Sequence, residues 1–146
     1  MEELFPDRLP PHHIEAEQAV LGAILLEPSV LTLVYERITA EDFYKQSHQR
    51  IFEAMVELSN KGEPVDLVTL TAALKDKNLL EETGGVSYLA ELASVVPTAA
   101  NVEYYAKIVE EKALLRRLIQ TATSIVSLGY SEDMEVSEII QEAEKR

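Results

Sequence analysis

The stretch 104-YYAKIVEEKALLRRLIQTATSIVSL-128 decides the fold, because it contains no proline or glycine and is typical of one uninterrupted helix. At about 100° per residue, its apolar side changes direction along its length. The first half places one set of apolar residues on a single face: Val102, Tyr105, Ala106, Val109 and Ala113. Beyond residue 113 the apolar residues gather on roughly the opposite face: Leu114, Leu115, Leu118, Ile119, Ala122, Ile125 and Val126.

The length of this helix makes the change of face significant. About 30 helical residues span about 45 Å. A compact head of about 100 residues is only roughly 35 Å across. We therefore expect the second half of the helix to overhang the head with its apolar side chains uncovered. Exposure of each large one would cost about 1.5–3 kcal/mol, so a partner should cover them.

A second helix after Gly129 supplies part of that cover. It carries an apolar stripe of Val136, Ile139, Ile140 and Ala143, so residues 98–146 are expected to form the long helix and an antiparallel helical hairpin. A two-helix hairpin cannot bury so wide a stripe, which predicts a dimer or higher oligomer around a twofold axis. The predicted self-association residues are Leu114, Leu115, Leu118, Ile119, Ala122, Ile125, Val126, Ile139 and Ile140. Two alternatives are that the hairpin folds back on its own head, or that these residues form only its internal core.

The chain before the long helix is expected to be an all-α head of five or six short helices, over residues 14–97. Three prolines mark residues 1–13 as an extended arm, and the first helix should cover Ile14 to Leu26, with Gly22 allowing another helix to come close. Thr39 with Asp42 resembles a capping box. Gly62 should end the helix that precedes Gly62 in the sequence. The predicted N-caps of later helices are Ser47, Asp66, Thr98 and Asp133.

The composition excludes several classes of protein. The chain has 146 residues, 47% of them apolar, no cysteine and a net charge of −13. Such a chain is folded rather than disordered, and it has no disulfide or thiolate metal site. It carries no secretory signal and no apolar run long enough to span a membrane, so a cytoplasmic protein with no membrane partner is expected. Its net negative charge argues against direct binding to nucleic-acid backbones.

No residue pattern indicates catalysis, a cofactor site or a metal site in this chain. There is no GxxxxGK[ST] loop to hold a nucleotide phosphate. His12 and His13 near Glu15 and Glu17 are a weak metal candidate, because adjacent histidines point apart. His48 is expected to be a surface or capping residue, and the scattered carboxylates to be solvated helix faces. Residue chemistry alone therefore indicates a helical interaction domain.

Four stretches carry a family resemblance: EAEQAVLGAILLEP at 15–28, DFYKQSHQRIFEAM at 42–55, PVDLVTLTAAL at 64–74, and GGVSYLAELASVVPTAANVEYYAKIVEEKALLRRLI at 84–119. They resemble the N-terminal domain of the DnaB family of bacterial replicative DNA helicases. The resemblance implies a collar of three dimers, joined through the hairpins, in an ATP-driven hexamer. It also implies an ATP- and Mg²⁺-dependent motor domain after Arg146, and the chain does stop in mid-helix. DNA would be contacted mainly by other domains.

The same resemblance implies partners. The collar would dock the C-terminal domain of DnaG primase, and a helicase loader is a further candidate partner. Candidate primase contacts are Glu15, Tyr88, Ile119 and Ile125, of which Glu15 has the alternative role of favouring the dipole of the first helix. The competing interpretation is a free-standing helical adaptor, such as the helicase-binding domain on the primase side. An enzyme in its own right is disfavoured, because no polar cluster converges in the sequence.

Overall fold

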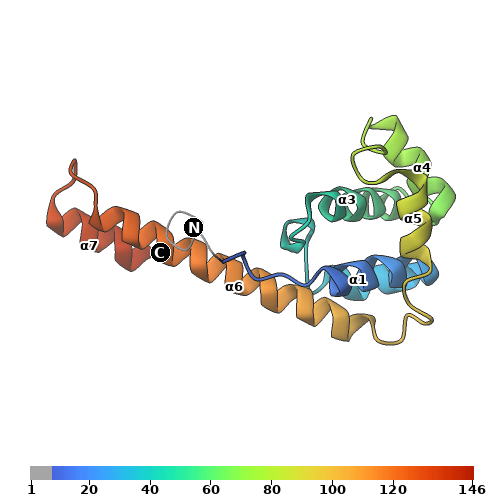
Figure 1. Ribbon diagram of the computed structural model, residues 1–146, viewed down its shortest axis with the longest axis horizontal. Helices are drawn as coiled ribbons and strands as arrows, with labels where there is room; N and C mark the ends of the chain where they lie inside the picture. The colour runs from blue at the N-terminus through green and yellow to red at the C-terminus, as the bar shows by residue number, and fades with distance from the viewer. Residues whose placement is uncertain (1–7) are drawn as a thin grey trace. The chain divides into compact units, whose positions relative to one another are not determined.

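The computed structural model describes residues 8–146, and within that range every regular element is a helix (Figure 1). The all-α prediction is therefore confirmed. The chain divides into two compact units. We call His12–Ala113 the head, and residues 114–146 with residues 8–11 the hairpin unit. Among the described residues no helix is long and apolar enough to cross a membrane.

The head is built from five α-helices, two 3₁₀ turns and the first part of a sixth helix. The first helix has the predicted bounds, and a 3₁₀ turn and a short α-helix follow it. In chain order the elements are α1 (Ile14–Leu26), η1 (Pro28–Val30), α2 (Leu31–Tyr35), η2 (Ala40–Asp42), α3 (Gln46–Asn60), α4 (Leu67–Asp76), α5 (Gly85–Ala93), α6 (Val102–Gly129) and α7 (Val136–Lys145).

The core of the head lies where α1, α3 and α5 meet. The rings of Phe43 and Phe52 are fully buried there, with their centroids 5.1 Å apart. Gly22 sits on the face of α1 that meets α5, and a Cβ at this position would lie 2.4 Å from the Leu92 carbonyl oxygen. The prediction that Gly22 admits a neighbouring helix is confirmed, because any side chain here would push the two helices apart.

The caps that depend on short sequence separations form as predicted. Thr39 and Asp42 make a capping box around η2, in which the Asp42 carboxylate accepts the Thr39 backbone N–H at 2.9 Å. Asp66 caps α4 and accepts the Thr69 N–H at 2.9 Å. Gly62, with φ +72°, ends α3, and the next N–H reaches back to the Leu58 carbonyl at 2.9 Å. These contacts satisfy backbone groups that helix ends leave open.

Three predicted N-caps are wrong. Ser47 lies inside the first turn of α3, whose N-cap is Lys45, and within the described chain its buried hydroxyl has no hydrogen-bond partner. Thr98 stands four residues before α6, and its hydroxyl accepts the N–H of Ala100 instead. Asp133 precedes α7, whose N-cap is Glu135 without a side-chain bond. Just before α3, the Glu17 carboxylate accepts the backbone N–H groups of Tyr44 and Lys45.

The long helix α6 is continuous over 28 residues and ends at Gly129 as predicted. Its buried residues are four of the five on the predicted first face, Val102, Ala106, Val109 and Ala113, and the fifth, Tyr105, is half-buried. No residue of α6 beyond Ala113 is buried. The apolar side that packs in the head therefore stops at the point where the sequence pattern changes face.

Candidate functional site

An exposed apolar surface covers the hairpin unit, and it is the first candidate site. The hairpin face, as we call it, comprises Leu114, Leu115, Leu118, Ala122, Ile125, Val126 and Ile140. Leu118 is 64% exposed, and Leu114 and Ile140 are each more than half exposed. Single exposed apolar residues are ordinary on protein surfaces, but a contiguous set marks an interaction surface.

Helix geometry makes this set continuous along α6. At about 100° per residue, Leu114, Leu118 and Ile125 fall within about 40° of one line. Ala122, Leu115 and Val126 lie beside them, within about 120° of Leu114. A stripe of this width is typical of a helix that packs against another element along its length. Within residues 8–146 of one chain, these side chains stay exposed.

The inner side of the hairpin is distinguished from this face by burial. Ile119 and Ile139, which the sequence places in the same self-association set, are only half-exposed. In Figure 1 α7 runs back along the end of α6, and the Arg146 guanidinium donates a hydrogen bond to the Ser124 hydroxyl across the two helices. Half-burial is what an internal hairpin position should show. These two residues therefore fit the alternative that they pack within the hairpin.

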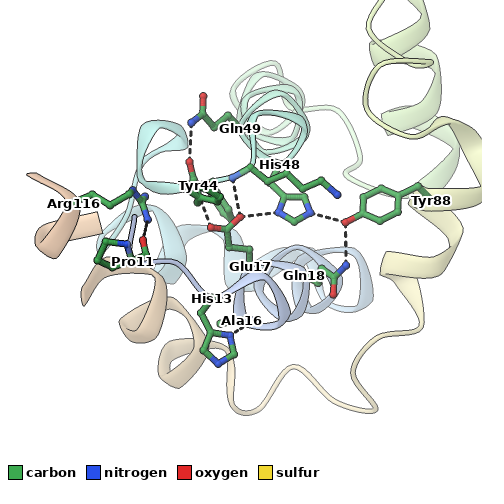
Figure 2. A network of polar contacts seen from close by, with 12 residues as sticks. Pro11, His13, Ala16, Glu17, Gln18, Tyr44, His48, Gln49, Tyr88 and Arg116 are labelled. Carbon is green, nitrogen blue, oxygen red and sulfur yellow. Dashed lines mark hydrogen bonds and ion pairs between the residues drawn. The ribbon is translucent and has the colours of Figure 1, made fainter. Parts of the chain in front are cut away.

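The head holds a second candidate, a chain of buried polar side chains (Figure 2). Glu17 on α1 is 1% exposed and His48 on α3 is fully buried. The Glu17 carboxylate lies 2.8 Å from His48 Nδ1, and it accepts the Tyr44 backbone N–H at 2.7 Å. His48 Nε2 lies 2.6 Å from the hydroxyl of Tyr88 on α5. Three helices are therefore tied together by one network.

The carboxylate determines how protons are arranged along this network. An ionised carboxylate only accepts hydrogen bonds, so His48 must carry its proton on Nδ1. In the neutral imidazole Nε2 is then an acceptor, and Tyr88 donates its O–H to it. The Tyr88 oxygen in turn accepts the side-chain amide of Gln18 at 3.2 Å. The side chains of Glu17, His48 and Tyr88 each have a partner of the right kind, which favours one arrangement of the three helices.

The predictions for His48 and for the acidic residues near it are wrong in part. His48 is neither a surface nor a capping residue, and Glu17 is not solvated. The two partners of His48 lie 31 and 40 residues away in the sequence, so local spacing gives no sign of them. The sequence does contain one sign that Glu17 is buried. Glu17 shares its helical face with Val20 and Ile24, and a charged residue on a buried stripe indicates a buried partner.

The other predicted site residues fall in both units. Glu15 is exposed in the first turn of α1, and Tyr88 is half-buried on α5, so both belong to the head. Ile119 and Ile125 belong to the hairpin unit.

The two adjacent histidines have separate structural contacts. His13 Nδ1 caps α1 by accepting the Ala16 N–H at 3.1 Å, and the ring of His12 stacks on Tyr44 with centroids 4.2 Å apart. In residues 8–146 no three side chains of histidine, cysteine or acid type group as metal ligands would.

Comparisons with known proteins agree over almost the whole chain. A family model described as the DnaB-like helicase N-terminal domain matches residues 9–111. The replicative DNA helicase DnaC of Bacillus subtilis (strain 168) is 61% identical over 145 residues, which are 99% of this chain and 32% of that protein. The chain thus spans about a third of that relative's length.

Two solved structures have similar folds. The crystal structure of the N-terminal domain of DnaB helicase from Mycobacterium tuberculosis matches with a TM-score of 0.90 at 45% identity, covering 94% of this chain and 96% of that one. A structure of a DnaB-like replicative helicase and its interactions with primase matches with a TM-score of 0.71 at 31% identity, covering 90% of this chain and 31% of that one.

Proposed function

Because the chain belongs to the family of DnaB-like helicase N-terminal domains, we propose that it acts as the collar of a hexameric replicative DNA helicase in the cytoplasm. In this proposal the chain associates with copies of itself and recruits primase, and it performs no catalysis. A motor domain elsewhere in the helicase uses ATP and Mg²⁺ and makes most DNA contacts. The net charge of −13 fits this division of labour, because an acidic collar does not compete for the DNA backbone.

The hairpin face is the observation that carries the proposal. Seven apolar residues on α6 and α7 are exposed in the described part of one chain, and a second hairpin packed antiparallel on the first would bury both sets at once. Three such dimers closing a ring would give a trimer of dimers. Full burial of an exposed leucine contributes about 1.5–3 kcal/mol. Leu118 is 64% exposed and a twofold contact counts it twice, so Leu118 alone contributes about 2–4 kcal/mol per dimer.

Primase recruitment rests on family membership and on the solved relative studied with primase. We propose the primase C-terminal domain as the partner, with Glu15, Tyr88, Ile119 and Ile125 as contacts. Tyr88 is the best supported of these by its setting, because its hydroxyl is held by His48 while the residue as a whole is only half-buried. A rigid, partly buried aromatic is typical of an interface anchor. A helicase loader is a second partner of the same collar in this proposal.

The competing function is a free-standing adaptor, such as the helicase-binding domain on the primase side. Such a domain would bind the collar rather than form it. The 61% identity to a replicative helicase favours the collar. An adaptor would also bind primase weakly or not at all, which separates the two proposals by experiment.

One set of mass measurements tests the proposal. Light scattering after size exclusion, at about 1–100 μM chain, should find dimers or larger assemblies. Leu118→Glu should weaken dimerisation by about 100-fold or more, whereas Val68→Glu, at an exposed valine of α4, should leave it unchanged. Wild-type chain that stays monomeric at the highest concentration would overturn the collar.

The same samples measured with the primase C-terminal domain test recruitment. Tyr88→Ala should weaken the complex by about tenfold and leave the oligomer intact, and Ile125→Ala should weaken the complex. Tyr104→Ala, at an exposed tyrosine of the head, is the matched control and should change neither. Full-strength primase binding by both test variants would remove these residues from the proposed contacts.

A further inference from the structure

A groove on the head runs between α2 and η2 on one side and α3 on the other. Its larger part is a hollow of about 510 Å³ lined by Tyr35, Thr39, Ala40, Glu41, Phe52, Glu53, Val56 and Glu57. A neighbouring hollow of about 200 Å³ is lined by Leu31, Thr32, Tyr35, Glu36, Val56, Ser59 and Asn60. Tyr35 and Val56 line both hollows, so the two form one continuous groove.

The floor of the groove is apolar and rigid. Phe52 is fully buried beneath it, and the Tyr35 ring stacks on Phe52 with centroids 6.3 Å apart and planes 20° apart. Tyr35 is nevertheless 53% exposed, so one face of its ring is open to a ligand. The α3 residues along the groove extend from Phe52 to Asn60, about 12 Å of helix. This length matches about two turns of a second helix laid alongside.

The rim of the groove is acidic. It carries Glu36, Glu41, Glu53 and Glu57, and neither hollow is lined by a lysine or arginine. Glu53 pairs with Arg50 at 3.2 Å and Glu57 pairs with Lys77, both across exposed positions. Among residues 8–146, Glu36 and Glu41 form no ion pair. The rim therefore keeps a net negative charge around an apolar floor.

We propose that this groove binds a short amphipathic helix of a basic partner protein, with one aromatic or aliphatic side chain against Tyr35 and Val56, which line both hollows. Lysine or arginine side chains of that helix face Glu36 and Glu41 at the rim. A second copy of this chain is a poor occupant, because it carries a net charge of −13 itself. The site goes beyond self-association and primase recruitment, since none of its lining residues belongs to the hairpin face or to the proposed primase contacts.

The test is a titration of ¹⁵N-labelled chain with a model helix of about 14 residues made of leucine and lysine. The matched probe replaces every lysine with glutamate. We expect chemical-shift changes centred on Tyr35, Phe52 and Val56 with the basic peptide and none with the acidic one. Changes centred on the hairpin face, or equal binding of both peptides, would overturn the proposal.

Two sets of variants separate the floor from the rim. Tyr35→Ala, at an exposed position that the fold tolerates, should weaken binding about tenfold. The triple change Glu36→Gln, Glu41→Gln and Glu53→Gln should weaken it about fivefold, with a steeper loss at low salt. A control triple at exposed positions, Glu81→Gln, Glu82→Gln and Glu91→Gln, should stay within about twofold of wild type. Unchanged affinity in either test variant contradicts the groove as the binding site.

Discussion

Replacing Glu17 with leucine should destabilise the head more than any surface change on the same helix. The carboxylate is 1% exposed and accepts hydrogen bonds from His48 Nδ1 at 2.8 Å and the Tyr44 N–H at 2.7 Å. Leucine has a similar size but no acceptor. The Tyr44 N–H then lacks an acceptor, and His48 can satisfy only one of its two ring nitrogens.

The magnitude follows from counting the groups left unpaired. Each buried polar group without a partner costs about 1–3 kcal/mol, and two are created here. The Lys45 N–H, 3.4 Å from the carboxylate, is left out of the count because Lys45 is exposed and water replaces the bond. Removal of a buried charge and the added apolar volume offset part of the loss. We expect Glu17→Leu to lower the free energy of unfolding by about 3–5 kcal/mol.

Urea unfolding followed by circular dichroism measures this free energy, with all variants at one protein concentration because self-association adds to apparent stability. Glu15→Leu is the matched control. It makes the same substitution two residues earlier, where the side chain is 86% exposed. The control should cost no more than about 1 kcal/mol, which is the scale of a first-turn helix-dipole contact.

Glu17→Gln distinguishes the network from simple loss of charge. Its amide can keep the Tyr44 contact through oxygen and donate to His48 Nδ1, provided that the imidazole moves its proton to Nε2 and donates to Tyr88. We therefore expect a cost of about half that of leucine. The reasoning is refuted if Glu17→Leu costs less than about 1 kcal/mol more than Glu15→Leu, or if glutamine costs as much as leucine.

Two further predictions concern other parts of the head. Gly22→Ala should lower the free energy of unfolding by about 2 kcal/mol or more, because its Cβ would meet the Leu92 carbonyl oxygen at 2.4 Å; Gly129→Ala, where a Cβ has nothing within 4 Å, should have no such cost in the same urea series. The hydrogen bond from the Thr69 backbone N–H holds the pKa of the Asp66 carboxyl below the ordinary value of 3.8. The stabilisation from ionised Asp66 is therefore complete above pH 3.8 and is lost as the pH falls through the lower pKa of the folded state. Asp66→Asn should flatten the acid-unfolding curve in this pH range, and an unchanged curve would contradict the capping role of Asp66.

The parts of the fold that depend on near neighbours in sequence are predictable. Asp66 and Thr69 are three residues apart, and so are Thr39 and Asp42, so the residue pattern itself contains both caps. Gly62 ends α3 for the same local reason. The failure at Ser47 has the opposite cause, because Glu17, from another helix, accepts the backbone N–H groups just before α3.

The candidate site was predictable in outline. The change of apolar face at Ala113 follows from periodicity alone, and the exposure of Leu114 and Leu118 agrees with it. The half-burial of Ile119 depends on how α7 lies against α6, which no spacing specifies. The groove at Tyr35 has no sequence signature, since residues from three separate elements line it.

The network of Glu17, His48 and Tyr88 has a consequence for how this domain changes over evolutionary time. Each residue sits on a different helix, and each fixes which proton the next one donates. A drift at any one position leaves a polar atom of its neighbour in the network without a partner, so tolerated replacements must arrive as matched sets. Homologues that lose the histidine should therefore also have lost the acid or the phenol, with an all-apolar trio as the natural substitute.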